Sequence, residues 1–200
     1  TMNCTVATEQ VAKLFGFSTR DGDALVQRTE PGAGGLAMLP FLNGERTPDL
    51  PHGKGVLAGL DLHNMEPAHL YRAAMEGATY SLKYGYDAFV RAGMRFERIV
   101  LTGGGGNSAA WRQMVADVFG LPVDVPRHAE GAAFGAALQA LWASGRAGGD
   151  GASIADVARA HVAIDPSLST TPDPARRDAY ARAYQRFLQY LDAVTPLQRG

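Results

Sequence analysis

The sequence has 200 residues, of which 46% are hydrophobic and 20% are charged, a balance typical of a globular domain with a buried core. Its formal net charge of −1 gives no general attraction for nucleic acid or an anionic membrane surface, and no apolar stretch is long enough to span a bilayer. The single cysteine, Cys4, excludes a disulfide framework within the chain and a cysteine-based zinc site, and it fits a reducing cytoplasm.

The first part of the chain predicts a short helix over residues 8–15 and two strands over residues 35–42 and 55–62. The polar stretch NGERTPDLPHGKG lies between the strands and predicts a connecting loop. Two strands joined in this way indicate an antiparallel pair.

A long helix and a third strand follow. Asn64 can cap the helix, Pro67 suits its first turn, and the helical pattern continues to about residue 92. The strand RIVLTG covers residues 98–103, and its continuous apolar character predicts burial on both faces.

The next helix begins at Asn107 or Ser108 and ends before Gly120 and Pro122. Helical spacing gives it one apolar face, formed by Trp111, Met114, Val115, Val118 and Phe119. A short strand over residues 122–126 and a helix over residues 130–145 come after it. This alternation of strands and helices predicts parallel strands with helices packed on them.

The composition changes after residue 145, where GRAGGDGAS reads as a loop and SIADVARA as a short helix. Asp173 can cap a terminal helix with Pro174 at its first position. The apolar stripe of this helix consists of Tyr180, Tyr184, Phe187, Leu188 and Leu191.

Four glycines, residues 103–106, separate the third strand from the next helix, which is where ligands bind in open α/β sheets. The helix start offers unpaired N–H groups and the positive end of the helix dipole, and glycine lets a ligand approach the backbone. A flexible turn is the alternative, although four glycines are entropically costly. We therefore interpret the stretch as a ligand-binding loop.

These glycines differ from two well-known phosphate-binding loops. A P-loop is excluded because no lysine follows them. A Rossmann turn fits Gly103 and Gly105 but departs at Ser108, and it normally opens its domain, whereas two strands precede it here. Asp124 lies at a suitable distance for a ribose contact, so the Rossmann site stays as an alternative.

Gly131, Ala132, Gly135 and Ala136 make one side of the 130–145 helix nearly flat. A flat helical side lets another element approach closely. For these residues alone, tight helix packing in a core is the simpler interpretation.

Several stretches resemble the FGGY carbohydrate kinases. GVLAGLDLHNMEPAHLYRAAME, residues 55–76, resembles the second signature of that family, and FLNGERTP, residues 41–48, is similar to a loop of its xylulokinase members. LTGGGGNSAAWRQMVADVFGLPV, residues 101–123, and EGAAFGAALQA, residues 130–140, resemble the family's adenosine-site loop and the interdomain helix of actin-like ATPases.

The resemblance implies an α/β fold of the actin-like ATPase, or ribonuclease H-like, class: a mixed sheet with antiparallel leading strands and helices on both faces. Residues 1–145 would form the C-terminal, ATP-binding domain, and residues 146–200 a helical extension packed on it. The family's N-terminal domain carries the sugar pocket, the first phosphate loop and the general-base aspartate. No segment here matches that domain, so we expect a part of a longer protein and assign no catalytic or metal-binding residue.

The resemblance also implies a site for ATP, with Mg²⁺. Gly103 and Gly104 would lie against the α-phosphate and ribose, and Ser108 or Asn107 would contact adenine. Gly77 and Ser81, one helical turn apart, would form a wall of the adenosine slot. For Gly77 relief of a helix crossing is the alternative, and for Ser81 a hydrogen bond to its own helix.

In the longer protein, MgATP would phosphorylate a primary hydroxyl of a ketopentose, D-xylulose in the first hypothesis. The alternatives are another FGGY sugar or polyol kinase, a Rossmann-type oxidoreductase or methyltransferase domain, and a non-catalytic actin-like regulator. We expect no nucleic-acid or membrane partner. A homodimer could form through the flat side of the 130–145 helix.

Overall fold

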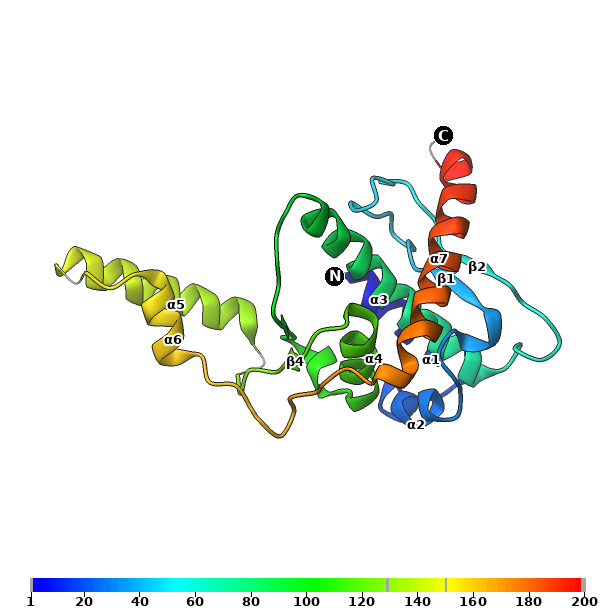
Figure 1. Cartoon of the computed structure of the whole chain (residues 1–200), viewed down its shortest axis with the longest axis horizontal. Helices are drawn as coiled ribbons and strands as arrows, with labels where there is room; N and C mark the ends of the chain where they lie inside the picture. Colours follow the sequence, from blue (N-terminus) through cyan, green and yellow to red (C-terminus); the bar gives the residue numbers. More distant parts are fainter. Residues whose placement is uncertain (1, 129, 150, 199–200) are drawn as a thin grey trace.

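The structure is a computed structural model, and it describes residues 2–128, 130–149 and 151–198. Its long helix α3 (Pro67–Arg91) runs through the middle of the main body (Figure 1). The elements that pack around it include α1 (Met2–Phe15), α2 (Gly22–Gln27), β1 (Ala37–Leu39), α4 (Ala109–Phe119) and α7 (Arg177–Gln198). As predicted, Pro67 opens α3, and the helix ends at Arg91 with Ala92 as its C-cap.

The main core lies between α1, α3, α7 and β1. Phe41 and Phe187 are fully buried in it, and the predicted stripe of α7 supplies Tyr180, Tyr184 and Leu191 as well. Burial of this apolar surface is the main stabilising contribution to the body. The sequence prediction for the face of α7 is confirmed.

The predicted antiparallel pair is formed by β1 and β2 (Val56–Ala58), with Ala37 opposite Ala58. Both strands are shorter than predicted. Pro40 follows β1 directly and lacks the N–H group that would extend the ladder. Gly59 follows β2 with φ +81°, a left-handed conformation that turns the chain out of the strand.

The strands β3 (Ile99–Val100) and β4 (Val123–Asp124) pair in parallel, as predicted. The predicted burial on both faces of β3 is wrong, because Val100 is 45% exposed. Val115 and Ala116 of α4 pack with Val123 beside this pair, which leaves the other side uncovered. Within the described residues, the two pairs form two separate two-stranded sheets and not the expected single mixed sheet.

Asn64 does not cap α3. Glu66 is the N-cap residue, and its side chain makes no capping bond. Asn64 is buried and holds two turns together instead: its Nδ2 donates to the carbonyl oxygens of Gly34 at 3.1 Å and Gly59 at 2.8 Å. Its Oδ1 accepts from the N–H of Asp61. This prediction was wrong because the loop before the helix is longer than a capping residue at 64 would allow.

The helices α5 (Gly131–Ala147) and α6 (Ile154–His161) pack against each other and extend away from the body as an arm (Figure 1). The side chain of Ser153 caps α6, and Asp156 completes a capping box with it. Asp173 caps a short 3₁₀ turn, Pro174–Arg176, that leads the chain back into α7. Among the described helices, none is both long and apolar enough to cross a membrane.

Candidate functional site

A pocket of about 610 Å³ opens between α1, α2, α3 and the glycine loop. Three of the six predicted site residues line it: Gly104, Asn107 and Ser108. The loop itself forms a 3₁₀ turn, η3 (Gly104–Asn107), directly after β3. The structure therefore brings the glycine loop to a concave surface, as a ligand-binding role requires.

The four glycines of this loop have different reasons to be glycine. Gly103 has φ +81°, which a residue with a side chain rarely adopts. A side-chain carbon on Gly105 would lie 1.9 Å from Cζ3 of Trp111, and one on Gly106 would lie 3.2 Å from Cγ1 of Val125. A side-chain carbon on Gly104 would meet no atom within 4 Å, and the backbone of Gly104 is not left-handed. Nothing within the described chain thus requires glycine at residue 104.

The Trp111 ring that packs on Gly105 is fixed from below by α3. Its Nε1 donates to Oγ1 of Thr79 at 3.0 Å, and that hydroxyl donates to the carbonyl of Met75 at 2.8 Å. Thr79 is fully buried. The shape of the glycine loop therefore depends on α3 as well as on α4.

Ser108 is the residue that caps α4, and its Oγ accepts from the N–H of Trp111 at 3.0 Å. Its hydroxyl also donates to Oδ1 of Asp23, a residue of α2. The other carboxylate oxygen, Oδ2, accepts from the N–H of Ala110 at 3.2 Å. The expectation of unpaired N–H groups at this helix start is thus wrong for Ala110 and Trp111, because the chain's own side chains bind them.

Gly77 and Ser81 lie apart from this pocket. A side-chain carbon on Gly77 would lie 2.1 Å from the carbonyl oxygen of Met38, so glycine is needed for α3 to pack closely on β1. The Ser81 hydroxyl donates to the carbonyl of Gly77 at 2.9 Å, a bond to its own helix. The alternative weighed for Ser81 is therefore seen, whereas Gly77 relieves the packing of a helix on a strand and not the helix crossing weighed from the sequence. Neither residue lines the pocket described here.

The remaining lining of the pocket is mixed in character. Asp23 and Glu9 contribute carboxylates, and Arg20 is the only cationic side chain among the described lining residues. Tyr71 contributes its hydroxyl, whose pKa burial raises and the nearby Asp23 carboxylate raises further. The hydroxyl is therefore a neutral hydrogen-bonding group at neutral pH, next to apolar Met75.

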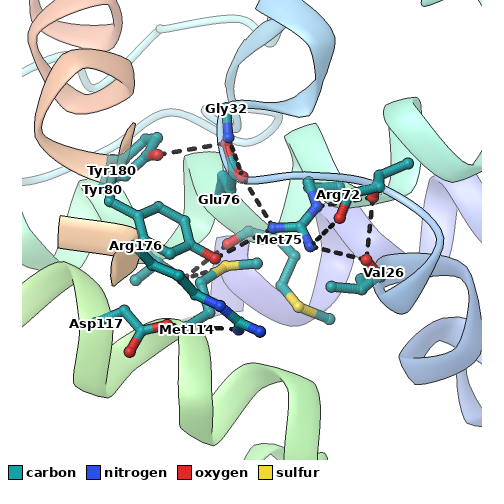
Figure 2. A network of polar contacts seen from close by, with 12 residues as sticks. Val26, Gly32, Arg72, Met75, Glu76, Tyr80, Met114, Asp117, Arg176 and Tyr180 are labelled. Atoms are coloured by element: carbon teal, nitrogen blue, oxygen red, sulfur yellow. Dashed lines mark hydrogen bonds and ion pairs between the residues drawn. The ribbon is translucent and has the colours of Figure 1, made fainter. Parts of the chain in front are cut away.

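A buried network holds α2 against α3 (Figure 2). The Arg72 guanidinium donates from Nη2 to the carbonyls of Val26 and Thr29, each at 2.7 Å. Its Nη1 donates to Oε1 of Glu76 at 3.3 Å and to the Tyr180 hydroxyl at 3.1 Å, which also joins α7 to the network. Arg72 and Glu76 are 4% and 1% exposed. The network therefore fixes the C-terminal end of α2, the helix to which Asp23 belongs.

The Glu76 carboxylate accepts hydrogen bonds from three residues, of which Arg72 is one. Oε1 also accepts from the N–H of Gly32 at 2.9 Å, and Oε2 accepts from the Tyr80 hydroxyl at 3.3 Å. Burial raises the pKa of the Glu76 carboxyl, and the charge of Arg72 offsets part of that rise. Complete hydrogen bonding is what makes such a buried ion pair tolerable.

A larger groove of about 1050 Å³ lies elsewhere, between α3, α4 and α7. Two of its charged lining residues, Lys83 and Asp87, pair with each other, and Asp87 also accepts from the Tyr184 hydroxyl at 2.8 Å. Arg176 pairs with the buried carboxylate of Asp117 at 3.6 Å (Figure 2). We favour the smaller pocket as the functional site because the open Gly104 backbone faces it.

Sequence reasoning located the glycine loop and the capping Ser108, but it missed Asp23 and Tyr71. Asp23 lies 85 positions before Ser108 in the sequence, and Tyr71 lies 37 positions before it. Neither residue belongs to a motif. Only tertiary packing brings them to the pocket. A lone Asp on a six-residue helix carries no signal that would have singled it out.

The comparisons with known proteins agree with one another. Residues 13–144 match the FGGY family of carbohydrate kinases, C-terminal domain. The chain is 37% identical over 193 residues to a xylulose kinase of Haemophilus influenzae, covering 96% of this chain and 38% of that protein. A gluconokinase of Bacillus licheniformis is 36% identical over 146 residues, covering 68% of this chain and 27% of that protein.

The fold gives the same result. The crystal structure of xylulose kinase from Rhodospirillum rubrum matches with a TM-score of 0.82 and 28% identity, covering 98% of this chain and 39% of that one. The chain thus spans less than half the length of these relatives. Family match, sequence identity and fold lead to one conclusion: this chain belongs to the FGGY family of carbohydrate kinases and corresponds to its C-terminal domain.

Proposed function

We propose that this chain is the nucleotide-binding part of an ATP-dependent sugar kinase, and that the whole protein converts D-xylulose to D-xylulose 5-phosphate. The observation that carries the nucleotide site is Gly104, which lines the pocket and is not required to be glycine by any neighbour within the described chain. A ligand lying against its backbone supplies the missing reason.

The proposed orientation puts adenosine in the pocket and the phosphates beyond the glycine loop. Asn107 and Ser108, which line the pocket, would contact adenine. Gly104, also in the lining, and Gly103, the residue before it, would lie against the ribose and α-phosphate. Gly77 would act indirectly, by setting how closely α3 packs on β1. Ser81 would act with it, through the hydrogen bond that its hydroxyl donates to the Gly77 carbonyl.

Several further features of the proposal follow from the family. Mg²⁺ would arrive with ATP and be held mainly by its phosphates, since the described residues contain no group of three His, Cys, Asp or Glu side chains placed to hold a metal ion. We assign the general base and the sugar pocket to parts of the protein beyond these 200 residues. The reaction itself would rest on positioning and charge stabilisation. A cytoplasmic location is proposed with it.

D-Xylulose is proposed because a relative 37% identical over nearly the whole chain is named xylulose kinase. The second candidate, a kinase for another sugar or polyol, is favoured by the relative named gluconokinase at 36% identity. Nucleotide binding is common to both, and assays of the full-length protein with each sugar decide between them.

The test of the nucleotide site is Gly104→Val, with calorimetric titration of ATP into the chain and its variant. We expect ATP binding to be lost, or weakened by at least about tenfold, because the valine side chain fills the space where the ligand lies. The melting temperature should stay near that of the unsubstituted chain, since no atom lies within 4 Å of the added carbon. Unchanged ATP affinity in a folded variant would contradict the site.

A further inference from the structure

The N terminus of α4 is already neutralised by a carboxylate from another helix. Asp23 of α2 accepts from the N–H of Ala110 through Oδ2 at 3.2 Å and from the Ser108 hydroxyl through Oδ1. The Ser108 Oγ in turn accepts from the N–H of Trp111 at 3.0 Å. Two first-turn amides of α4 are therefore bound within the chain.

The position of Asp23 is built into the packing of α2. A side-chain carbon on Gly22 would lie 2.3 Å from the Tyr71 ring, so glycine allows the start of α2 to lie directly on α3. At the other end of α2, the buried Arg72 binds the carbonyl of Val26 at 2.7 Å. The backbone of α2 is thus fixed on both sides of Asp23, at Gly22 and at Val26, and the side chain of Asp23 lines the pocket.

This arrangement has an electrostatic consequence for a nucleotide. The N terminus of a helix attracts anions through its free N–H groups and its dipole. In α4 a full negative charge already lies there, and a phosphate would meet that charge instead of the free N–H groups of Ala110 and Trp111. The backbone at Gly104, in the loop before α4, is still accessible to a ligand.

We propose that Asp23 is a positioning residue that excludes phosphate from the N terminus of α4, so that this end of the pocket receives the uncharged nucleoside and the phosphates lie on the other side of Gly104. The proposal rests on the nucleotide site proposed above and adds the residue that sets the direction of the bound nucleotide.

The test uses Asp23→Asn and inorganic pyrophosphate as an anion without a nucleoside. Asparagine keeps an oxygen that can accept from the N–H of Ala110 and an amide that can donate to Ser108, but it removes the charge. We expect calorimetry to show pyrophosphate binding strengthened by about tenfold in this variant, at low salt. The melting temperature reports whether α2 stays in place, and Asp23→Ser repeats the neutralisation with a smaller side chain.

The control is Glu9→Gln, which removes an equal charge from the lining of the same pocket, on α1. It should change pyrophosphate affinity by less than about twofold, because this carboxylate does not bind the amides of α4 that are described above. The proposal is overturned if folded Asp23→Asn binds pyrophosphate no better than the unsubstituted chain, or if Glu9→Gln gains as much.

A separate titration with adenosine distinguishes this inference from the proposed function. Adenosine affinity should change by less than about threefold in Asp23→Asn if charge exclusion is the main role of the residue. Loss of adenosine binding together with unchanged pyrophosphate binding would overturn the inference and make Asp23 a nucleoside contact. If the unsubstituted chain binds no adenosine, the proposed nucleotide site fails, and the pyrophosphate comparison still decides the role of Asp23.

Discussion

Neighbouring glycines in one loop can serve packing or ligand access, and the structure distinguishes the two. Gly105 is in contact with the Trp111 ring, which is itself fixed by a hydrogen bond to Thr79. Gly104 faces open space. The same substitution at these two positions should therefore have opposite effects on stability and on binding.

We predict that Gly105→Ala lowers the free energy of unfolding by about 1–3 kcal/mol, because the added methyl group overlaps the indole ring and forces it to move. Gly104→Ala is the matched control and should stay within about 0.5 kcal/mol of the unsubstituted chain. Urea denaturation of both variants measures the difference. Equal stability of the two variants would show that the loop adjusts without displacing Trp111.

At this scale the sequence identified the loop but not its surroundings. The glycines and Ser108 could be predicted because a strand, a Gly-rich turn and a helix start are consecutive in the chain. Asp23 could not, since the hydrogen bond to Ser108 joins residues 85 positions apart. The sequence also could not decide between packing and binding for Gly77, because the nearby carbonyl of Met38 belongs to a different element.

At the scale of elements, α3 is held to α2 and α7 by one buried guanidinium. Arg72 donates to Val26, Thr29, Glu76 and Tyr180, and its removal would leave the Glu76 carboxylate without its counter-charge. A buried charge without a partner is strongly destabilising. The network should therefore be far more sensitive to the loss of one partner than to the loss of both.

We predict that Arg72→Met lowers the free energy of unfolding by about 3–5 kcal/mol at pH 7. The loss should be smaller near pH 4, because a carboxyl whose folded-state pKa is raised stabilises the fold when protonated and loses that contribution as pH rises through its pKa. Removing Arg72 raises the pKa of Glu76 further, since the charge of Arg72 is the largest of the effects that lower it. Denaturant unfolding at the two pH values measures the effect.

The double variant Arg72→Met/Glu76→Leu is the control for this prediction. It replaces the buried charges with apolar groups, so it should recover a large part of the stability lost in Arg72→Met. A pH-independent loss in the single variant would show that the broken carbonyl contacts at Val26 and Thr29, and not the unpaired charge, account for the effect.

Sequence patterns predicted the helices of this chain better than its strands. Helices α3, α4 and α7 have long apolar periodicities and clear end signals, such as Pro67 and the left-handed Gly120. The strands are two or three residues long, too short for alternation to define their ends. The exposure of Val100 was not predictable either, because burial of a strand depends on which elements cover the sheet.

At the scale of the whole molecule, the chain consists of a body and a projecting arm (Figure 1). The body contains the core and the candidate site, whereas α5 packs chiefly against α6. Gly131 approaches the body at Thr102, where a side-chain carbon would lie 3.0 Å away. Ala132 and Ala136, two residues of the predicted flat side, are exposed, and so is Leu141 at 48%. This exposed apolar side is therefore the surface of the arm that another copy of the chain could cover.

We predict that the chain self-associates at high concentration through α5 and that Ala136→Arg prevents it, because a charge in the middle of a flat apolar surface would have to be buried unpaired. The free energy of unfolding should change by less than about 0.5 kcal/mol, since the residue is exposed and lies outside the core. Sedimentation velocity over a range of concentrations measures the association. Ala155→Arg adds the same charge to an exposed position of α6 and should leave it unchanged. A chain that stays monomeric at every concentration would contradict a self-interface on the flat side, whereas association that survives Ala136→Arg would place the self-interface elsewhere.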